Sequence, residues 1–366
     1  MDTEKLSNIK LSPVITFAAI IIVIAGIRSA ESIVNPFLLA VFISIISTHP
    51  IEWMEKKGIP HTLAVVSIII LILLIIIGVG GLTGTSVANF SANLPSYERR
   101  LRDIELNSLK YLDAFGIDFS EEHIFQAFDS RKILSFTASV LNSLGGLMGT
   151  SLLIFITVLF MLLESKSFIY KFSIISNQPR ETEVRVAEII SNVNRYLTLK
   201  TLTSLVTGIL ISLWLWIIGV DYPVLWGLLA FLLNYIPNIG SLIAAIPAVL
   251  LAIIQLNTAG VILTMVGYLV INLVMGSLVE PRIMGRGLGI STLVIFLSLI
   301  FWGWVLGPIG MFLSTPLTMS VKIAFETNED TRWFAVLLSS MKKTTDRHLP
   351  VKPEDYKNPS EQRKKT

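Results

Sequence analysis

The residues best suited to chemistry in this chain are polar groups set into apolar surroundings. Glu280, Pro281 and Arg282 close a long apolar run, and Arg286 follows a few residues later. One acidic group beside two basic groups at such a boundary predicts an ion-paired gate. The alternative is that these side chains only anchor the end of the run, because long charged side chains at a membrane boundary routinely reach into water.

A second polar group interrupts the apolar run Pro223–Leu256. It contains Asn234, Pro237, Asn238 and Gly240. Proline lacks an N–H donor and glycine tolerates unusual backbone angles, so the pattern predicts a turn. Irregular backbone at membrane depth persists only where protein or a water-filled cavity satisfies it, and transporters use such breaks to bind solutes. The turn therefore either lines a solute path or connects two short helices at the membrane surface.

A third polar group, Asn272, lies alone within the apolar run Ala259–Val279. Its amide either contacts a solute or hydrogen-bonds a neighbouring helix, a contact worth about 0.6 kcal/mol within membranes.

The sequence lacks the familiar patterns of catalysis. It contains neither a Walker P-loop nor a GxSxG elbow. The four histidines lie outside the apolar runs, so none can serve as a base within the membrane, and no two are spaced to ligate a metal on one helix. There is no cysteine, which excludes thiol chemistry and cysteine-based zinc sites. We therefore expect no enzymatic activity, no metal site and no cofactor.

The composition indicates that these polar groups are held by helices that cross a membrane. Apolar residues make up 53% of the chain and charged residues 15%, against about 25% charged in soluble proteins. The mean hydropathy is +0.71, and the net charge of +3 is too small to predict nucleic-acid binding. Six charge-free runs are long enough for helices that cross a hydrocarbon core of about 30 Å. They are Leu11–Ile27, Ile33–Ser47, Thr62–Leu82, Leu144–Leu163, Thr201–Val220 and Ala259–Val279.

Two longer apolar runs are broken in the middle. Pro223–Leu256 is interrupted by the turn described above, and Ser291–Val321 by Gly303, Gly307–Pro308 and Gly310. Both are predicted to be helical hairpins, either re-entrant or built from short spans. The predicted fold class is an all-α polytopic membrane protein with about six spanning helices plus two broken helical hairpins.

The predicted domain organisation follows the distribution of charge. Residues 1–84 form N-terminal membrane helices, 85–140 a small extracytoplasmic insertion of two amphipathic helices, 141–330 the membrane core, and 331–366 a largely disordered cytoplasmic tail. Lys and Arg outnumber Asp and Glu in the loop 164–200 and after residue 341. Because cytoplasmic loops are enriched in basic residues, both termini are predicted in the cytoplasm of a bacterium, with the chain in its inner membrane.

Three ordered motifs resemble the autoinducer-2 exporter (AI-2E) family. They are Phe231–Ser241, Leu278–Gly289, and Leu306–Met311 with Thr315–Leu317. The resemblance implies a membrane protein of the eight-helix type that moves the furanose-like signal autoinducer-2 outward, and assembly as homo-oligomers such as pentamers. The motif residues of the family correspond to these positions of this chain: Asn234, Pro237, Gly240, Glu280, Pro281, Arg282 and Gly285.

The leading hypothesis is therefore a secondary transporter that exports a small polar solute, with the Pro237 turn and the Glu280–Arg282 element bordering the inner half of its path. One alternative is a sodium/proton antiporter, for which Glu280 is the strongest titratable candidate. Another is a non-transporting membrane scaffold or receptor that uses the 87–140 segment to bind a partner. The expected partners are the lipid bilayer, the solute and further copies of the chain, without nucleic acid.

Overall fold

The computed structural model describes residues 13–114, 135, 137–139, 149–164, 179–237, 239–284, 289–326 and 331–339. Five helices are long and apolar enough to cross a membrane by length and composition: Glu31–Lys56, His61–Ile104, Ala187–Ile218, Thr258–Ile283 and Thr292–Glu326. Side chains such as Ile77 and Leu269 are 61% and 67% exposed. A surface of this kind suits lipid, and the predicted all-α polytopic class is confirmed.

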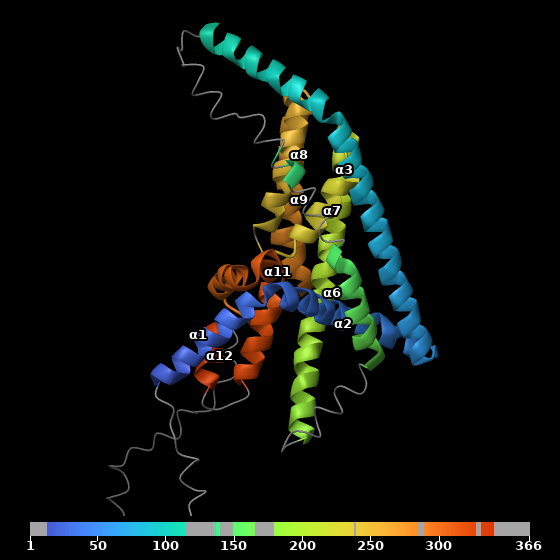
Figure 1. Ribbon diagram of the computed structural model, residues 1–366, viewed down its shortest axis with the longest axis vertical. Coiled ribbons are helices and arrows are strands. Elements are labelled where there is room, and N and C mark those ends of the chain that lie inside the picture. Colours follow the sequence, from blue (N-terminus) through green and yellow to red (C-terminus); the bar gives the residue numbers. More distant parts are fainter. Residues whose placement is uncertain are drawn as a thin grey trace, which may run out of the picture.

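The N-terminal helices α1 (Pro13–Ser29) and α2 (Glu31–Lys56) match the first two predicted spans. Figure 1 shows them meeting at an open angle near the middle of the molecule, in the same region as α11. Within the described residues, α1 and the helix Gly149–Glu164 are the shorter of the helices that match predicted spans, and both border residues that the structure does not describe.

Two predicted spans continue as much longer helices. The third span is the first part of α3 (His61–Ala114), a 54-residue helix that passes residues 84 and 85 without interruption. The first predicted amphipathic helix of the insertion is therefore the end of α3, and the second lies outside the described residues. Similarly, α6 (Pro179–Ile218) joins the fifth predicted span to the polar helix before it over 40 residues.

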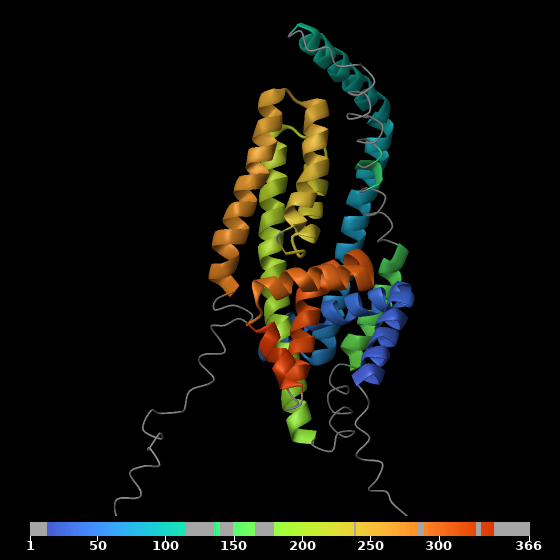
Figure 2. The same cartoon turned by 90° about the vertical axis from the view of Figure 1, so that its left-hand side faces the viewer.

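The first broken run folds as the predicted hairpin. Helices α7 (Pro223–Leu233) and α8 (Gly240–Gln255) run in opposite directions, so the hairpin enters and leaves at the same end of the bundle (Figure 2). It packs tightly on α6, where a Cβ added at Gly208 would lie 2.6 Å from the carbonyl oxygen of Gly227. Glycine at both positions lets the two backbones approach this closely.

The chain then returns along α6 as α9 (Thr258–Leu273) and η1 (Val274–Val279), a wider helical turn, and ends in the short α10 (Glu280–Met284). This segment corresponds to the sixth predicted span. Wide π-type turns within helices are rare and often occur at functional sites. Here the wide turn directly precedes Glu280.

The second broken run is α11 (Thr292–Glu326), which is interrupted only at Gly307 (φ 62°, ψ −151°). Gly303 and Gly310 lie in regular helix, so their predicted role as interruptions was wrong. Gly307 accepts a positive φ that other residues resist, and Pro308 cannot donate the next backbone hydrogen bond. The two halves fold toward each other, since the Trp302 indole donates to Thr318 Oγ1 at 3.0 Å.

The first half of α11 lies across the bundle and the second half runs along it (Figure 2). After α11, the short helix α12 (Arg332–Leu338) packs back, and the Ser291 amide donates to the Leu338 carbonyl at 3.1 Å. The predicted cytoplasmic tail thus begins with an ordered helix, and the rest of it lies outside the described residues.

Candidate functional site

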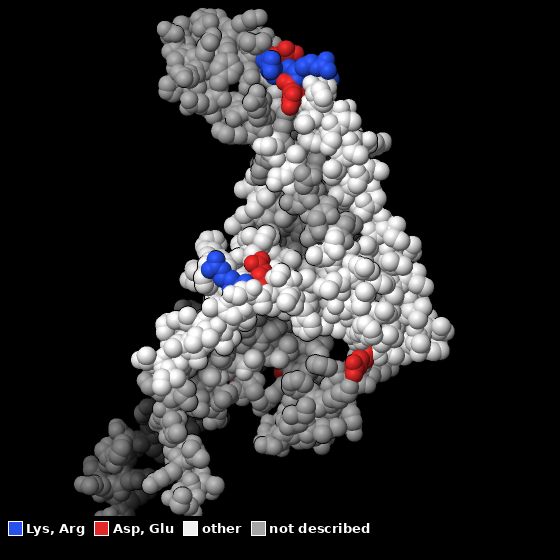
Figure 3. Space-filling model, in the orientation of Figure 1, with Lys and Arg blue, Asp and Glu red and all other residues white. Residues whose placement is uncertain are grey.

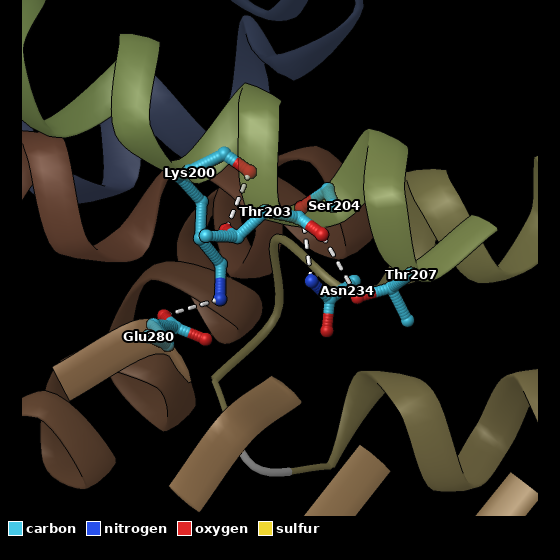
Figure 4. A network of polar contacts seen from close by, with 6 residues as sticks. All are labelled: Lys200, Thr203, Ser204, Thr207, Asn234 and Glu280. Atoms are coloured by element: carbon cyan, nitrogen blue, oxygen red, sulfur yellow. Dashed lines mark hydrogen bonds and ion pairs between the residues drawn. The ribbon is translucent and has the colours of Figure 1, made fainter. Parts of the chain in front are cut away.

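The centre of the candidate site is an ion pair between Lys200 of α6 and Glu280 of α10. The Lys200 ammonium lies 2.7 Å from Glu280 Oε1, and the two side chains are 5% and 23% exposed (Figure 4). Lysine is almost never buried this deeply without a partner. The pair therefore fixes the end of the α9–α10 segment against the middle of α6.

The turn of the first hairpin lies next to this ion pair on α6. The Asn234 amide donates to Ser204 Oγ at 3.0 Å, and Ser204 is about one helical turn from Lys200 (Figure 4). The buried hydroxyls of Thr203 and Thr207 donate to carbonyls of α6 itself, at 3.1 and 2.8 Å. These residues make a polar strip along the face of α6 that the hairpin covers.

Tyr235 connects the turn to α11. Its hydroxyl lies 2.5 Å from Thr201 Oγ1, which itself donates to the Leu197 carbonyl at 2.7 Å. Because a threonine hydroxyl has a single proton, Tyr235 must be the donor to Thr201. The tyrosine ring stacks on Phe312 with centroids 4.3 Å apart and an interplanar angle of 25°. The hairpin turn therefore packs against both α6 and the second half of α11.

The turn itself is tight. The Ile239 amide donates to the Pro237 carbonyl at 2.7 Å, and a Cβ added at Gly240 would lie 1.7 Å from the Leu233 carbonyl oxygen. Only glycine fits at this position without moving the backbone. Asn238, which we also predicted to border the path, lies outside the described residues.

The partner of Glu280 differs from the one we predicted. Arg282 and Pro281 are exposed, and Arg282 forms no ion pair among the residues that the structure describes. Arg286 and Gly285 lie outside those residues. Lys200 was not predicted as a site residue, because it immediately precedes the span Thr201–Val220 and resembles an ordinary boundary lysine. Its distant partner is visible only in the folded chain.

Asn272 is half-buried on α9, and within the described ranges its side chain has no hydrogen-bond partner. The alternative that it binds a neighbouring helix thus gains no support from the contacts of α9, and its contact with a solute stays a prediction.

A second polar cluster, also missed by the sequence analysis, joins the opposite end of the hairpin to α3. The Tyr97 hydroxyl donates to Asp221 Oδ2 at 2.8 Å, and the Gln255 amide donates to the same carboxylate. The Trp226 indole donates to the Asp221 carbonyl oxygen at 2.9 Å. These contacts tie α3, the start of α7 and the end of α8 together.

The groups that converge around Lys200 and Glu280 suit binding and movement of a polar molecule. They supply charges of both signs, an amide, hydroxyls and a stacked aromatic pair. In the described ranges, no three His, Cys, Asp or Glu side chains gather as metal ligands. Such a site offers hydrogen bonds and an ion pair that can exchange partners.

The fold and the site together define a polytopic α-helical membrane protein with two interrupted apolar segments, one of which turns beside a buried ion pair. Such an arrangement is typical of secondary transporters. Comparison with known sequences agrees with this class of protein. The chain belongs to the AI-2E transporter family, whose model matches residues 14–330.

Several bacterial proteins are similar over most of their length. The AI-2 transport protein TqsA of Escherichia coli K12 is 40% identical over 334 residues, covering 91% of this chain and 97% of the relative. A putative transport protein of Haemophilus influenzae is 39% identical over 331 residues, covering 88% and 95%. The more distant putative transport protein YrrI of Bacillus subtilis is 24% identical over 307 residues, covering 80% and 86%.

Proposed function

We propose that this chain is a secondary transporter that exports autoinducer-2, or a similar small polar solute, across the bacterial inner membrane. Membership in the AI-2E family and the similarity to a protein named for AI-2 transport support the solute. The expected orientation has both termini in the cytoplasm, and the expected assembly is a homo-oligomer such as a pentamer. Neither an enzymatic step nor a cofactor is part of the proposal.

The observation that carries the proposal is the buried Lys200–Glu280 ion pair beside the Asn234 turn. In this position the pair joins α6 to the end of the α9–α10 segment, while Asn234 joins α6 to the hairpin. A path along the polar strip of α6 requires these contacts to separate. The pair therefore acts as a gate, and Asn234, Pro237 and Gly240 border the path.

The gating role predicts that the charges matter for transport more than for folding. Removing one partner of a buried pair leaves an uncompensated charge, whereas replacing both by neutral side chains of similar volume is often tolerated. The informative variant is therefore the double substitution Lys200→Met with Glu280→Gln. It removes the ion pair without leaving a buried charge.

The test is export of labelled autoinducer-2 from vesicles that contain the purified full-length chain, with and without sodium and proton gradients. The double variant is expected to insert and unfold like the wild type but to lose at least about ten-fold in transport rate. Glu188→Gln, which neutralises an exposed carboxylate on α6, is the matched control and should transport normally.

Each outcome separates the alternatives. Normal flux in the double variant would refute the gate. If the wild-type chain moves no autoinducer-2 but exchanges sodium for protons, the antiporter hypothesis would replace the exporter hypothesis. If the chain moves neither the solute nor ions, the remaining hypothesis would be a non-transporting scaffold or receptor.

A further inference from the structure

A separate polar cluster lies where α1 and α2 meet the break of α11. Asn35 Nδ2 lies 3.3 Å from Glu31 Oε1 and 3.1 Å from the Leu306 carbonyl oxygen, and it donates to both. The Glu31 carboxylate reaches Gly307, because a Cβ added there would lie 2.5 Å from Glu31 Oε1. A carboxylate, an amide and a backbone carbonyl thus converge at a helix interruption.

The amide of Asn35 is only partly satisfied. Its side chain is 7% exposed, and its Oδ1 is buried without a hydrogen-bond partner. Its NH₂ group bridges the two oxygens of Glu31 and Leu306. Rotation of the amide by about 180° exchanges its O and N atoms, since the two ends have nearly the same shape. That rotation would place a third oxygen beside the other two.

The break in α11 strengthens this arrangement. The first half of α11 ends at Leu306, and the last carbonyls of a helix lack partners within the helix. They also carry the partial negative charge of the helix dipole. In transporters, unwound carbonyls and helix C-termini of this kind coordinate coupling cations.

Glu31 is the only Asp or Glu side chain in the stretches of α1, α2 and α11 that form this cluster. Arg28 and Glu31 are the only Lys, Arg, Asp or Glu residues between positions 11 and 51, and none occurs between 291 and 321. The Arg28 guanidinium lies over the Trp304 ring, 4.5 Å from its centroid, and forms no ion pair with Glu31 among the described contacts. Figure 3 shows one small group midway along this face, in which basic and acidic atoms lie side by side within uncharged surface.

We propose that Glu31, Asn35 and the Leu306 carbonyl bind a small monovalent metal cation, of which sodium is the probe. Carboxylate, amide and carbonyl oxygens are ligands for hard cations. A single carboxylate in apolar surroundings balances one positive charge, which favours a monovalent ion over calcium or magnesium. The site is distinct from the Lys200–Glu280 gate. Cation binding to this site is measured without any transport assay, so the result does not depend on the identity of the transported solute.

The test is thermal unfolding of the purified full-length chain in detergent at fixed pH, in sodium chloride against choline chloride of equal ionic strength. Sodium should raise the midpoint in the wild type because it binds the folded state. Glu31→Gln removes the charged ligand and should weaken the apparent sodium affinity by about ten- to a hundred-fold. Glu52→Gln, an exposed carboxylate on the same helix, should respond like the wild type.

A second variant keeps the proposal testable if Glu31→Gln does not fold. Asn35→Leu keeps the charge but removes the buried amide oxygen, and it should also reduce the sodium response. A wild-type chain that unfolds identically in sodium and choline would overturn the proposal, as would a sodium shift that is equal in the wild type and in both site variants.

Discussion

The energetics of the Lys200–Glu280 pair give the sharpest prediction. Glu280→Gln leaves the Lys200 ammonium buried, with 5% of its side chain exposed. Removing one partner of a buried pair typically costs about 3–5 kcal/mol. The reverse variant, Lys200→Met, leaves the Glu280 carboxylate, which is 23% exposed and can be hydrated in part. We therefore expect about 3 kcal/mol or more for Glu280→Gln and a smaller loss for Lys200→Met.

The double variant should be close to the wild type in stability, because it leaves no unpaired charge. The free energies of unfolding of the wild type, both single variants and the double variant form a double-mutant cycle. They are measured by denaturant unfolding in one detergent. A smaller loss for Glu280→Gln than for Lys200→Met, or additive losses in the double variant, would show that the ion pair is not closed in the folded protein.

Three further substitutions test the packing around the site. Gly227→Val should lower the stability measured by thermal unfolding by about 1–3 kcal/mol or more, because its Cβ would lie 2.5 Å from a carbonyl oxygen of α6. Gly81→Ala is the control: its Cβ meets nothing within 4 Å, so the substitution should be nearly neutral. Tyr97→Phe removes the donor to Asp221 and should speed amide hydrogen exchange in the part of α3 around residue 97, with unchanged exchange counting against the contact. Tyr235→Phe keeps the ring stacking but loses the hydroxyl contact to α6, so it should lower stability by about 1 kcal/mol, and an unchanged unfolding midpoint would contradict that contact.

The apolar runs predicted most of the helices because lipid requires long, charge-free segments, and this requirement is visible in any one segment alone. The turn at Pro237 and the break at Gly307 were also predictable, since proline and glycine act on their own backbone. Gly303 and Gly310 were wrongly predicted to interrupt α11. In the folded chain they lie where the two halves approach each other, and glycine serves close packing as readily as it serves a turn.

The partners across the fold were not predictable. Lys200 and Glu280 are 80 positions apart, and Asn35 and Leu306 are 271 apart. Nothing in the local sequence around Lys200 distinguishes it from a lysine that marks a membrane boundary. Glu280 and the hairpin turn were predicted as polar groups in apolar surroundings, and the structure brings both onto α6. The contacts that unite them depend on how α6 passes both.

The continuity of α6 has a consequence for how the protein moves. At about 1.5 Å per residue, its 40 residues form a rod about 60 Å long. Asn194, just before its middle, donates to Thr48 of α2, and Gly208, further along the helix, packs against Gly227 of α7. A rod without a hinge cannot bend to release one set of partners while keeping the other. Displacement of the hairpin must therefore occur by sliding or pivoting along α6, and crosslinks between α6 and α7 should stop it wherever along their contact they are placed.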